Sequence, residues 1–310
     1  MSQVQMVTVV KDDNDIRLDR WFKRNFPKVS HISVEKALRK GQIRVDGQKV
    51  KSSHKVQEGS VVRVPPMVEY TRQEKPKKQI DEKYIKIIQD SVIYKDAEII
   101  VINKPAGLAV QGGVGVDVCV DVLLDFLKFD YEQRPKIVHR LDKDTSGVLV
   151  LARKTNVAAK LSEMFRSKEA EKIYWSVVIK TPKIKEGKIN MPLLKRDTGA
   201  GKEKVVYDEE GQNATTFYRV MDDLAGKVSL VELRPITGRT HQLRVHMSEV
   251  GHPILGDGKY GGKEAFIDGL SKKMHLHARS LKLPNKPLFT ADLTGDMKKT
   301  ILELELDVNK

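Results

Sequence analysis

The sequence predicts an α+β protein in which a small α/β module precedes a larger domain with a mixed or mainly antiparallel sheet. Runs of apolar and β-branched residues typical of strands outnumber the helical patterns, and the connections between them are irregular. A polar, charged stretch broken by Pro76, residues 73–83, separates the two parts. We therefore expect a module over residues 1–70, a linker over 71–90 and a larger domain over 91–310.

Composition restricts the class of protein further. The chain has 310 residues and a formal net charge of +14, and hydrophobic residues make up 40%, which excludes wholesale disorder. The single cysteine, Cys119, excludes an internal disulfide and any zinc or iron–sulfur site built from several cysteines. No apolar run approaches the ~18 residues of a membrane span, and we expect a cytoplasmic protein with no membrane partner. The basic surplus indicates a polyanionic partner without saying which one.

The positive charge is concentrated near the start of the chain. Residues 16–64 hold 13 Lys and Arg against 4 Asp and Glu, a net charge of +9, whereas residues 91–310 hold 36 against 30, a net charge of +6. The charge density of the N-terminal module is therefore several times that of the larger domain.

The module alternates short helices with strands. The predicted elements are a helix over 16–26 stopped by Pro27, a helix over 33–40 ended by Gly41, a hairpin over 43–50 that turns at Asp46-Gly47, and a strand over 61–64. Basic residues follow each helix at spacings of three and four: Arg17, Arg20 and Arg24 on the first, and Lys36, Arg39 and Lys40 on the second. Two such faces can follow a phosphate backbone, and the scarcity of acids favours this over two ordinary solvated faces.

The stretch ALRKGQIRVDGQKV, within residues 15–65, resembles the S4-type RNA-binding domain. The resemblance implies binding to structured RNA, which proteins read mostly through shape and backbone. The six basic residues of the two helices, together with Arg44 in the hairpin, are the expected RNA contacts.

The larger domain is predicted to be rich in strands. Expected helices cover 118–129, 155–166 (capped by Thr155) and 240–250 (capped by Thr240), and expected strands cover 92–94, 99–103, 137–142, 148–152, 173–179, 216–221, 228–233 and 272–283. The last strand alternates apolar residues with His275, His277 and Arg279, which predicts that one of its faces is exposed.

Reactive side chains are densest in residues 138–147, VHRLDKDTSG. If this stretch is extended, Arg140, Asp142 and Asp144 share one face. A carboxylate between basic groups at the end of a strand is a candidate nucleophile or base, although a charged turn after a buried strand explains an isolated HRLD equally well.

Several motifs together resemble the RluA family of pseudouridine synthases. They are INKPAGLAVQGGVG, HRLDKDTSG, EKIYWSVV, MPLLKR, RPITGRTHQLRVHM and GHPILGDGKYG, in the family's order over residues 91–283. The module in front and the QGGVG and MPLLK segments are similar to the RluC-like branch, which acts on large-subunit ribosomal RNA. The resemblance implies a catalytic role for Asp142, an active-site tyrosine at Tyr174, pairing of Arg244 with the aspartate, and insertion of Arg140 where the flipped nucleotide was.

The chemistry of that reaction is consistent with these residue types. Turning uridine into pseudouridine breaks the N1–C1′ bond and joins C5 to C1′; nothing is oxidised and no group is imported, so we expect no cofactor and no metal. An ionised carboxylate can attack C1′ or take a sugar proton, and a paired guanidinium keeps it ionised. An aromatic ring can hold the flipped base by stacking.

Two other functions stay open on sequence grounds. One is a non-catalytic RNA-binding or ribosome-assembly factor on the same fold; the other is a hydrolase that cleaves an N-glycosidic bond with Asp142 and Asp144. The turn at residues 111–115 lacks the spacing of a nucleotide-binding loop, and the histidine pairs 241/246 and 275/277 are expected at the surface or in hydrogen-bond networks rather than on a metal. We expect a monomer without an obligate protein partner.

Overall fold

The computed structural model describes residues 3–66, 80–113, 115–199 and 203–309. The chain divides into two units, residues 1–79 and 80–310, which are described separately. Part of the expected linker, residues 71–79, lies outside the described residues. Its remainder is not a linker: helix α3 (Glu82–Asp90) begins there, and its Ile88 is fully buried in the core of the second unit.

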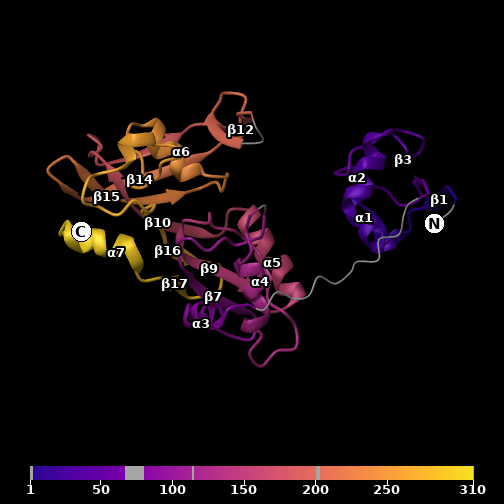
Figure 1. Ribbon diagram of the computed structural model, residues 1–310, viewed down its shortest axis with the longest axis horizontal. Helices are drawn as coiled ribbons and strands as arrows, with labels where there is room; N and C mark the ends of the chain where they lie inside the picture. Colours follow the sequence, from indigo (N-terminus) through magenta and orange to yellow (C-terminus); the bar gives the residue numbers. More distant parts are fainter. Residues whose placement is uncertain (1–2, 67–79, 114, 200–202, 310) are drawn as a thin grey trace. The chain divides into compact units, whose positions relative to one another are not determined.

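The N-terminal unit is a small α/β fold (Figure 1). Its elements are β1 (Gln5–Thr8), the 3-10 helix η1 (Lys11–Asp13), β2 (Ile16–Arg17), α1 (Leu18–Asn25), α2 (His31–Arg39), β3 (Arg44–Val45), β4 (Lys55–Val56) and β5 (Val61–Val64). A three-stranded sheet has the order β1-β5-β3, and β2 pairs with β4. Buried Leu18, Trp21 and Phe22 anchor α1.

Two expectations for this unit need adjustment. The first helix begins at Leu18 rather than at Ile16, because Ile16 and Arg17 pair with β4. The hairpin is shorter than predicted, since β3 pairs mainly with β5, but its turn is where the sequence places it. Asp46 and Gly47 both have positive φ, +47° and +75°, the conformation that an Asp-Gly hairpin turn favours.

A ten-stranded sheet organises the second unit. Its strands are β6 (Val92–Lys95), β7 (Ile99–Lys104), β8 (Lys136–Ile137), β9 (Ser146–Ala152), β10 (Glu171–Ile179), β11 (Glu186–Asn190), β14 (Thr215–Leu224), β15 (Val228–Pro235), β16 (Leu276–Lys282) and β17 (Leu288–Thr290). The order is β11-β14-β15-β10-β16-β9-β7-β6, with β17 on β16 and β8 on β9. Among the described strands only β9 and β16 run parallel, so the expected mixed, mainly antiparallel sheet is confirmed.

Helices and a small hairpin surround this sheet. They are α4 (Val120–Leu123) with the 3-10 helix η2 (Leu124–Leu127), α5 (Thr155–Arg166), α6 (Gln242–Glu249), the 3-10 helix η3 (Gly262–Ala265), α7 (Gly295–Glu303), and the pair β12 (Leu193–Asp197) and β13 (Glu203–Tyr207). Helix α5 has the predicted bounds, but Lys154 rather than Thr155 is its N-cap residue. Likewise His241, not Thr240, precedes α6. No helix among the described residues is long and apolar enough to cross a membrane.

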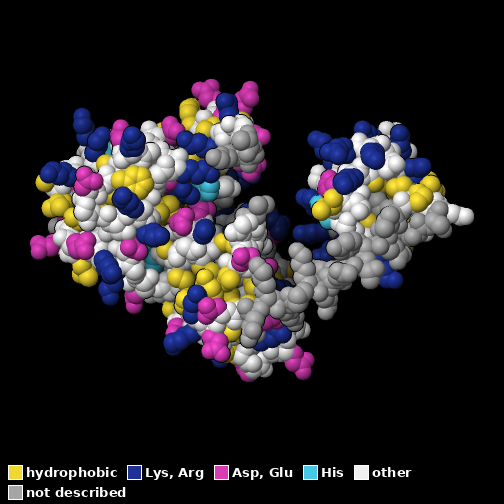
Figure 2. All heavy atoms as spheres, viewed as in Figure 1, with side chains coloured by type: hydrophobic (Ala, Val, Ile, Leu, Met, Phe, Trp, Pro, Cys, Tyr) yellow, Lys and Arg dark blue, Asp and Glu magenta, His cyan; other side chains and the backbone are white. Residues whose placement is uncertain are grey.

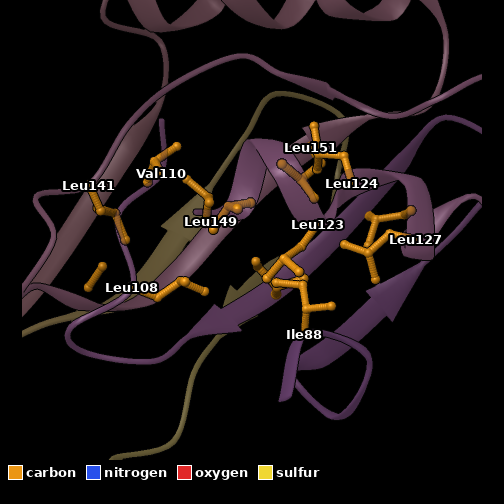
Figure 3. Packing of buried hydrophobic residues seen from close by; sticks show 13 residues of the cluster. Ile88, Leu108, Val110, Leu123, Leu124, Leu127, Leu141, Leu149 and Leu151 are labelled. Carbon is orange, nitrogen blue, oxygen red and sulfur yellow. The ribbon is translucent and has the colours of Figure 1, made fainter. Parts of the chain in front are cut away.

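One hydrophobic cluster links the sheet to the loop that carries Asp142. In Figure 3, leucines of β9 (Leu149, Leu151) lie beside side chains of α3, α4 and η2. Leu108, Val110 and Leu141, all at most 8% exposed, extend the same cluster into two irregular loops. Because Leu141 is fixed in this core, the position of the next residue, Asp142, is set by packing.

Candidate active site

Asp142 lies in a loop rather than on a strand. The expected strand over 137–142 ends at Ile137, and residues 143 and 144 form a turn before β9 begins. The Thr145 N–H donates to the backbone carbonyl of Asp142 (3.2 Å), which closes that turn. The shared face predicted for Arg140, Asp142 and Asp144 is therefore absent, because it required an extended backbone.

Lys104 ties the Asp142 loop to the loop that follows β7. Its ammonium group, fully buried, donates to the carbonyls of Pro105 (2.9 Å), Leu108 (2.8 Å) and Lys143 (3.1 Å). Burial lowers the pKa of Lys104 to about 7, although the charges of Asp144 and Asp142 oppose the shift. A point charge with three donors can hold three carbonyls together, so this lysine fixes the loops on both sides of it.

Arg244 faces Asp142 from α6 but has a second, closer partner. Its Nε and Nη2 each donate to Asp257 at 2.7 Å, whereas Nη1 is 3.4 Å from Asp142 Oδ2. Asp257 is 2% exposed and Arg244 8%. Burial acts to lower the pKa of Arg244. The hydrogen bonds to Asp257 outweigh this effect, so the pKa of Arg244 is raised. The predicted pair thus becomes a chain of three groups, in which Asp257 orients the guanidinium toward Asp142.

Asp257, which binds Arg244 in the structure, was not among the residues that the sequence singled out. The signal was present, because Asp257 lies in the GHPILGDGKYG segment that was used only for the resemblance. The preceding Gly256 has φ +81°, and a Cβ there would lie 1.9 Å from the carbonyl oxygen of Lys273, so only glycine fits at this position.

A cavity of about 610 Å³ opens next to Asp142. Tyr174 of β10, Arg244 and residues of the 235–243 loop line it, together with Gln111 and Gly112 of the QGGVG turn. Burial, and then the charge of Asp142, raise the pKa of Tyr174, so its hydroxyl stays protonated. The cavity brings the three predicted catalytic side chains to one place.

Comparisons with known proteins agree with this geometry. A family model described as RNA pseudouridylate synthase matches residues 98–249. Ribosomal large subunit pseudouridine synthase C of Rickettsia felis is 36% identical over 285 residues, covering 91% of this chain and 92% of the relative. The chain belongs to the RNA pseudouridine synthase family. A relative of the same name from Salmonella typhi is 34% identical over 302 residues, covering 96% of this chain and 92% of its own length.

Solved structures place the catalytic unit in the same fold. The human RNA Pseudouridylate Synthase Domain Containing 4 is 31% identical with a TM-score of 0.63, and the match covers 74% of this chain and 98% of that one. The human RNA Pseudouridylate Synthase Domain Containing 1 is 25% identical with a TM-score of 0.53, covering 69% and 94%. The protein is therefore an RNA pseudouridine synthase, an isomerase.

Arg140 of the synthase lies at the cavity wall with its side chain exposed. Its Nη1 is 3.4 Å from Oε1 of Gln111, so this long contact spans two loops of the cavity. An exposed guanidinium here can move toward RNA at low cost, which is compatible with the insertion that the resemblance implies.

His139, one residue before Arg140, faces inward. Its Nε2 accepts the N–H of Val150 (2.9 Å), and its ring stacks on Phe165 with centroids 4.2 Å apart. Burial, and then the charge of Lys172, lower the pKa of His139 to about 3. The neutral imidazole thus connects the loop that carries Asp142 to strand β9.

His275 and His277 of the synthase take part in hydrogen-bond networks, one of the two settings expected for them, whereas the exposed strand face that the alternation predicted is not observed. His275 bonds to the Lys273 carbonyl (2.7 Å) and Thr300 Oγ1 (2.9 Å), and His277 to Ser146 Oγ (2.8 Å) and the Ala291 carbonyl (3.0 Å). Both are 0% exposed: His277 lies in β16, a central strand with buried side chains on both faces, and His275 directly precedes it, a setting that alternation alone cannot reveal. Within the described residues, no group of His, Cys, Asp and Glu is arranged to hold a metal ion.

His241 has the most unusual backbone in the site. It occupies the left-handed region, φ +53° and ψ 19°, immediately before α6. Its Nδ1 is 2.6 Å from the Tyr260 hydroxyl, and its Nε2 is 3.8 Å from Asp142 Oδ2. A non-glycine residue in this region costs about 1–2 kcal/mol, and such conformations gather at functional sites.

In the N-terminal unit, the seven predicted RNA contacts are all exposed: Arg17, Arg20, Arg24, Lys36, Arg39, Lys40 and Arg44. Figure 2 shows dark blue side chains gathered over the part of this unit that Figure 1 labels α2 and β3. Two of the seven also form salt bridges, Arg17 with Asp19 and Arg24 with Asp13, each with an N···O distance of 2.7 Å. The other cations are available to a polyanion without breaking those pairs.

Proposed function

We propose that this protein converts specific uridines of large-subunit ribosomal RNA to pseudouridine. The substrate class is supported by relatives of that name from Rickettsia felis and Salmonella typhi, which align with more than nine-tenths of the chain. The exposed basic surface of α1 and α2 is what an RNA-docking module needs, and we propose that this unit is an S4-type domain that binds the same RNA.

The observation that carries the catalytic assignment is the geometry around Asp142. Its carboxylate, 29% exposed, adjoins a cavity and faces a guanidinium that Asp257 holds from behind. A buried ion pair of this kind is weakly explained as a stabilising device, because desolvation offsets most of its attraction. It is well explained as a way to orient one carboxylate at the ribose of a flipped nucleotide.

We assign the remaining roles by position. Tyr174 lines the cavity with an uncharged phenol ring against which a uracil can stack, a contact worth about 1–3 kcal/mol. Arg140 is placed to enter the vacancy that the flipped base leaves. Extrusion of the base costs a few kcal/mol, so the stacking and the insertion together offset much of that cost.

The alternative of a paired-carboxylate hydrolase has little support in the geometry. Asp142 and Asp144 both line a second hollow, of about 570 Å³, but Asp144 does not line the cavity that holds Tyr174. A hydrolase that used both carboxylates would therefore have to bind its nucleoside in a hollow that lacks the Tyr174 ring against which a base can stack.

One assay separates the three functions. The full-length protein is incubated with large-subunit rRNA carrying tritium at uridine C5, and released tritium and free uracil are measured. Tritium release without uracil supports the synthase; uracil supports the hydrolase; neither product, with RNA bound, supports a non-catalytic factor. The modified uridines are then identified by mapping pseudouridines in rRNA from cells that lack the protein.

A further inference from the structure

We infer that His241 positions the Asp142 carboxylate and that Tyr260 fixes the imidazole tautomer needed for this. The inference rests on the catalytic role proposed for Asp142. It concerns a residue that contacts neither the base nor the sugar in our assignment. It follows from the contacts of Tyr260, of His241 and of Asp142, taken in that order.

The first contact fixes the direction of the Tyr260 hydroxyl. The N–H of Val205, in β13, points at Tyr260 Oη from 3.4 Å and can only donate. Burial raises the pKa of Tyr260, so the phenol keeps its proton. Within the described residues, the hydroxyl has no acceptor other than His241 Nδ1, 2.6 Å away, so the O–H donates there.

The second contact follows from the first. Because Nδ1 accepts from Tyr260, the proton of the neutral imidazole resides on Nε2. Nε2 is the nitrogen that faces Asp142 Oδ2 at 3.8 Å, and the opposite tautomer would direct a lone pair at a carboxylate. The tautomer that Tyr260 selects is thus the one that Asp142 also favours.

The imidazole stays neutral in this setting. Burial lowers the pKa of His241; of the charges around it, Arg244 and Lys259 lower it further, while Asp142 and Asp257 act in the opposite direction without prevailing. At 3.8 Å from Asp142 Oδ2, beyond hydrogen-bond distance, a neutral N–H acts on the carboxylate as an oriented dipole without adding a second cation beside Arg244.

The third contact shows what this arrangement achieves. Arg244 Nη1 and His241 Nε2 approach the same oxygen of Asp142, Oδ2. Within the described part of the chain, Oδ1 has no hydrogen-bond partner and is free to act on the ribose. With His241 in the left-handed backbone conformation, its ring lies next to both Tyr260 and Asp142.

The test uses two substitutions that separate the two nitrogens of the ring. In His241→Gln the side-chain amide can occupy the place of Nε2 and donate to Asp142. In His241→Asn the shorter amide reaches only the place of Nδ1, keeps the contact to Tyr260, and tolerates the left-handed backbone well. Turnover of an rRNA fragment gives kcat and KM for each full-length variant, and thermal unfolding checks that both are folded.

We expect His241→Asn to lower kcat about 10–100-fold with KM unchanged, as for other residues that orient an active-site group, and His241→Gln to keep most of the activity. A histidine that only anchors the loop to Tyr260 would give the reverse order, and that order, or equal rates for both variants, would overturn the inference. If wild-type protein itself released no tritium from RNA, the proposed function would fail instead, so the two failures are distinguishable.

A spectroscopic measurement tests the tautomer directly. In protein labelled with ¹⁵N-histidine, the signals absent from His241→Asn belong to His241. We expect the neutral form with its proton on Nε2 between pH 6 and 8, and a loss of that preference in Tyr260→Phe. A protonated ring, a proton on Nδ1, or an unchanged tautomer in Tyr260→Phe would each contradict the role assigned to Tyr260.

Discussion

The two units of this synthase carry charge in opposite ways. In the N-terminal unit the cations are exposed, and even a paired one such as Lys55, with Asp15, keeps more than half of its side chain in solvent. In the catalytic unit Arg244 and Asp257 are almost fully buried and hold each other through two hydrogen bonds of 2.7 Å. Exposed charges attract a polyanion at a distance and are screened by salt, whereas buried charges fix geometry and resist screening.

The difference explains why a net charge alone says little about mechanism. The +14 of the chain resides disproportionately in a unit that, in our proposal, docks RNA. In the same proposal, the chemistry depends on one acid, Asp142, and on the guanidinium of Arg244 that faces it. Substitutions of the buried charges and of the exposed charges should therefore have different consequences.

The largest effect is expected at Asp142. Asp142→Asn keeps the shape of the side chain but removes the negative charge that acts at the ribose, and activity should fall at least about 1,000-fold, as when other catalytic groups are removed. Single-turnover tritium release measures this. Binding of RNA by the variant should persist, and a variant that retained full activity would refute the assignment.

The next effect concerns the buried pair. Asp257→Asn leaves Arg244 buried without a full counter-charge, and loss of one partner of such a pair costs about 3–5 kcal/mol in the free energy of unfolding. The matched control, Asp15→Asn, removes the exposed partner of Lys55 and should cost about 0–1 kcal/mol. Denaturant unfolding of both variants checks the contrast, and similar losses would show that burial is not what separates the two units.

These buried partners also mark where prediction from sequence stops. The sheet class, α5 and the turn at Asp46-Gly47 follow from local patterns, since periodicity and turn chemistry are local properties. The partnership of Arg244 with Asp257 does not, because it depends on how a loop 13 residues downstream folds back onto α6.

Two failures of prediction have the same origin. The sequence HRLD looks extended, but tertiary packing of Leu141 and the carbonyl contacts of Lys104 hold it as a loop. The alternation in β16 suggests an exposed face, but side chains on both faces of that central strand are buried. Local propensity was overridden in both cases by contacts distant in sequence.

A pH effect on stability is expected from His139, whose Nε2 accepts the Val150 N–H and whose ring stacks on Phe165. The pKa of His139 is about 3 in the folded protein, against about 6.5 unfolded. The unfolded chain therefore binds a proton that the folded chain does not, and stability falls as pH drops from about 6.5 toward 3, by up to about 1.4 kcal/mol per pH unit from this residue. In His139→Gln, unfolding measured at pH 6, 5 and 4 should show a correspondingly shallower loss; parallel curves for the two proteins would contradict the shift.

The smallest effect per residue is expected when exposed basic residues of the N-terminal unit are replaced. Replacing Lys36, Arg39 and Lys40 by Gln should weaken RNA binding and reduce the slope of log K against log salt by up to about 0.9 for each phosphate that the variant no longer neutralises. The control variant replaces three lysines of the catalytic unit that are exposed and lie outside the cavity: Lys263, Lys298 and Lys299. The rate at saturating RNA should stay unchanged in both, because neither set touches Asp142. If both triple variants lowered the slope equally, general charge rather than the N-terminal unit would account for docking, and a reduced saturating rate in the first would show that these cations serve the chemistry as well.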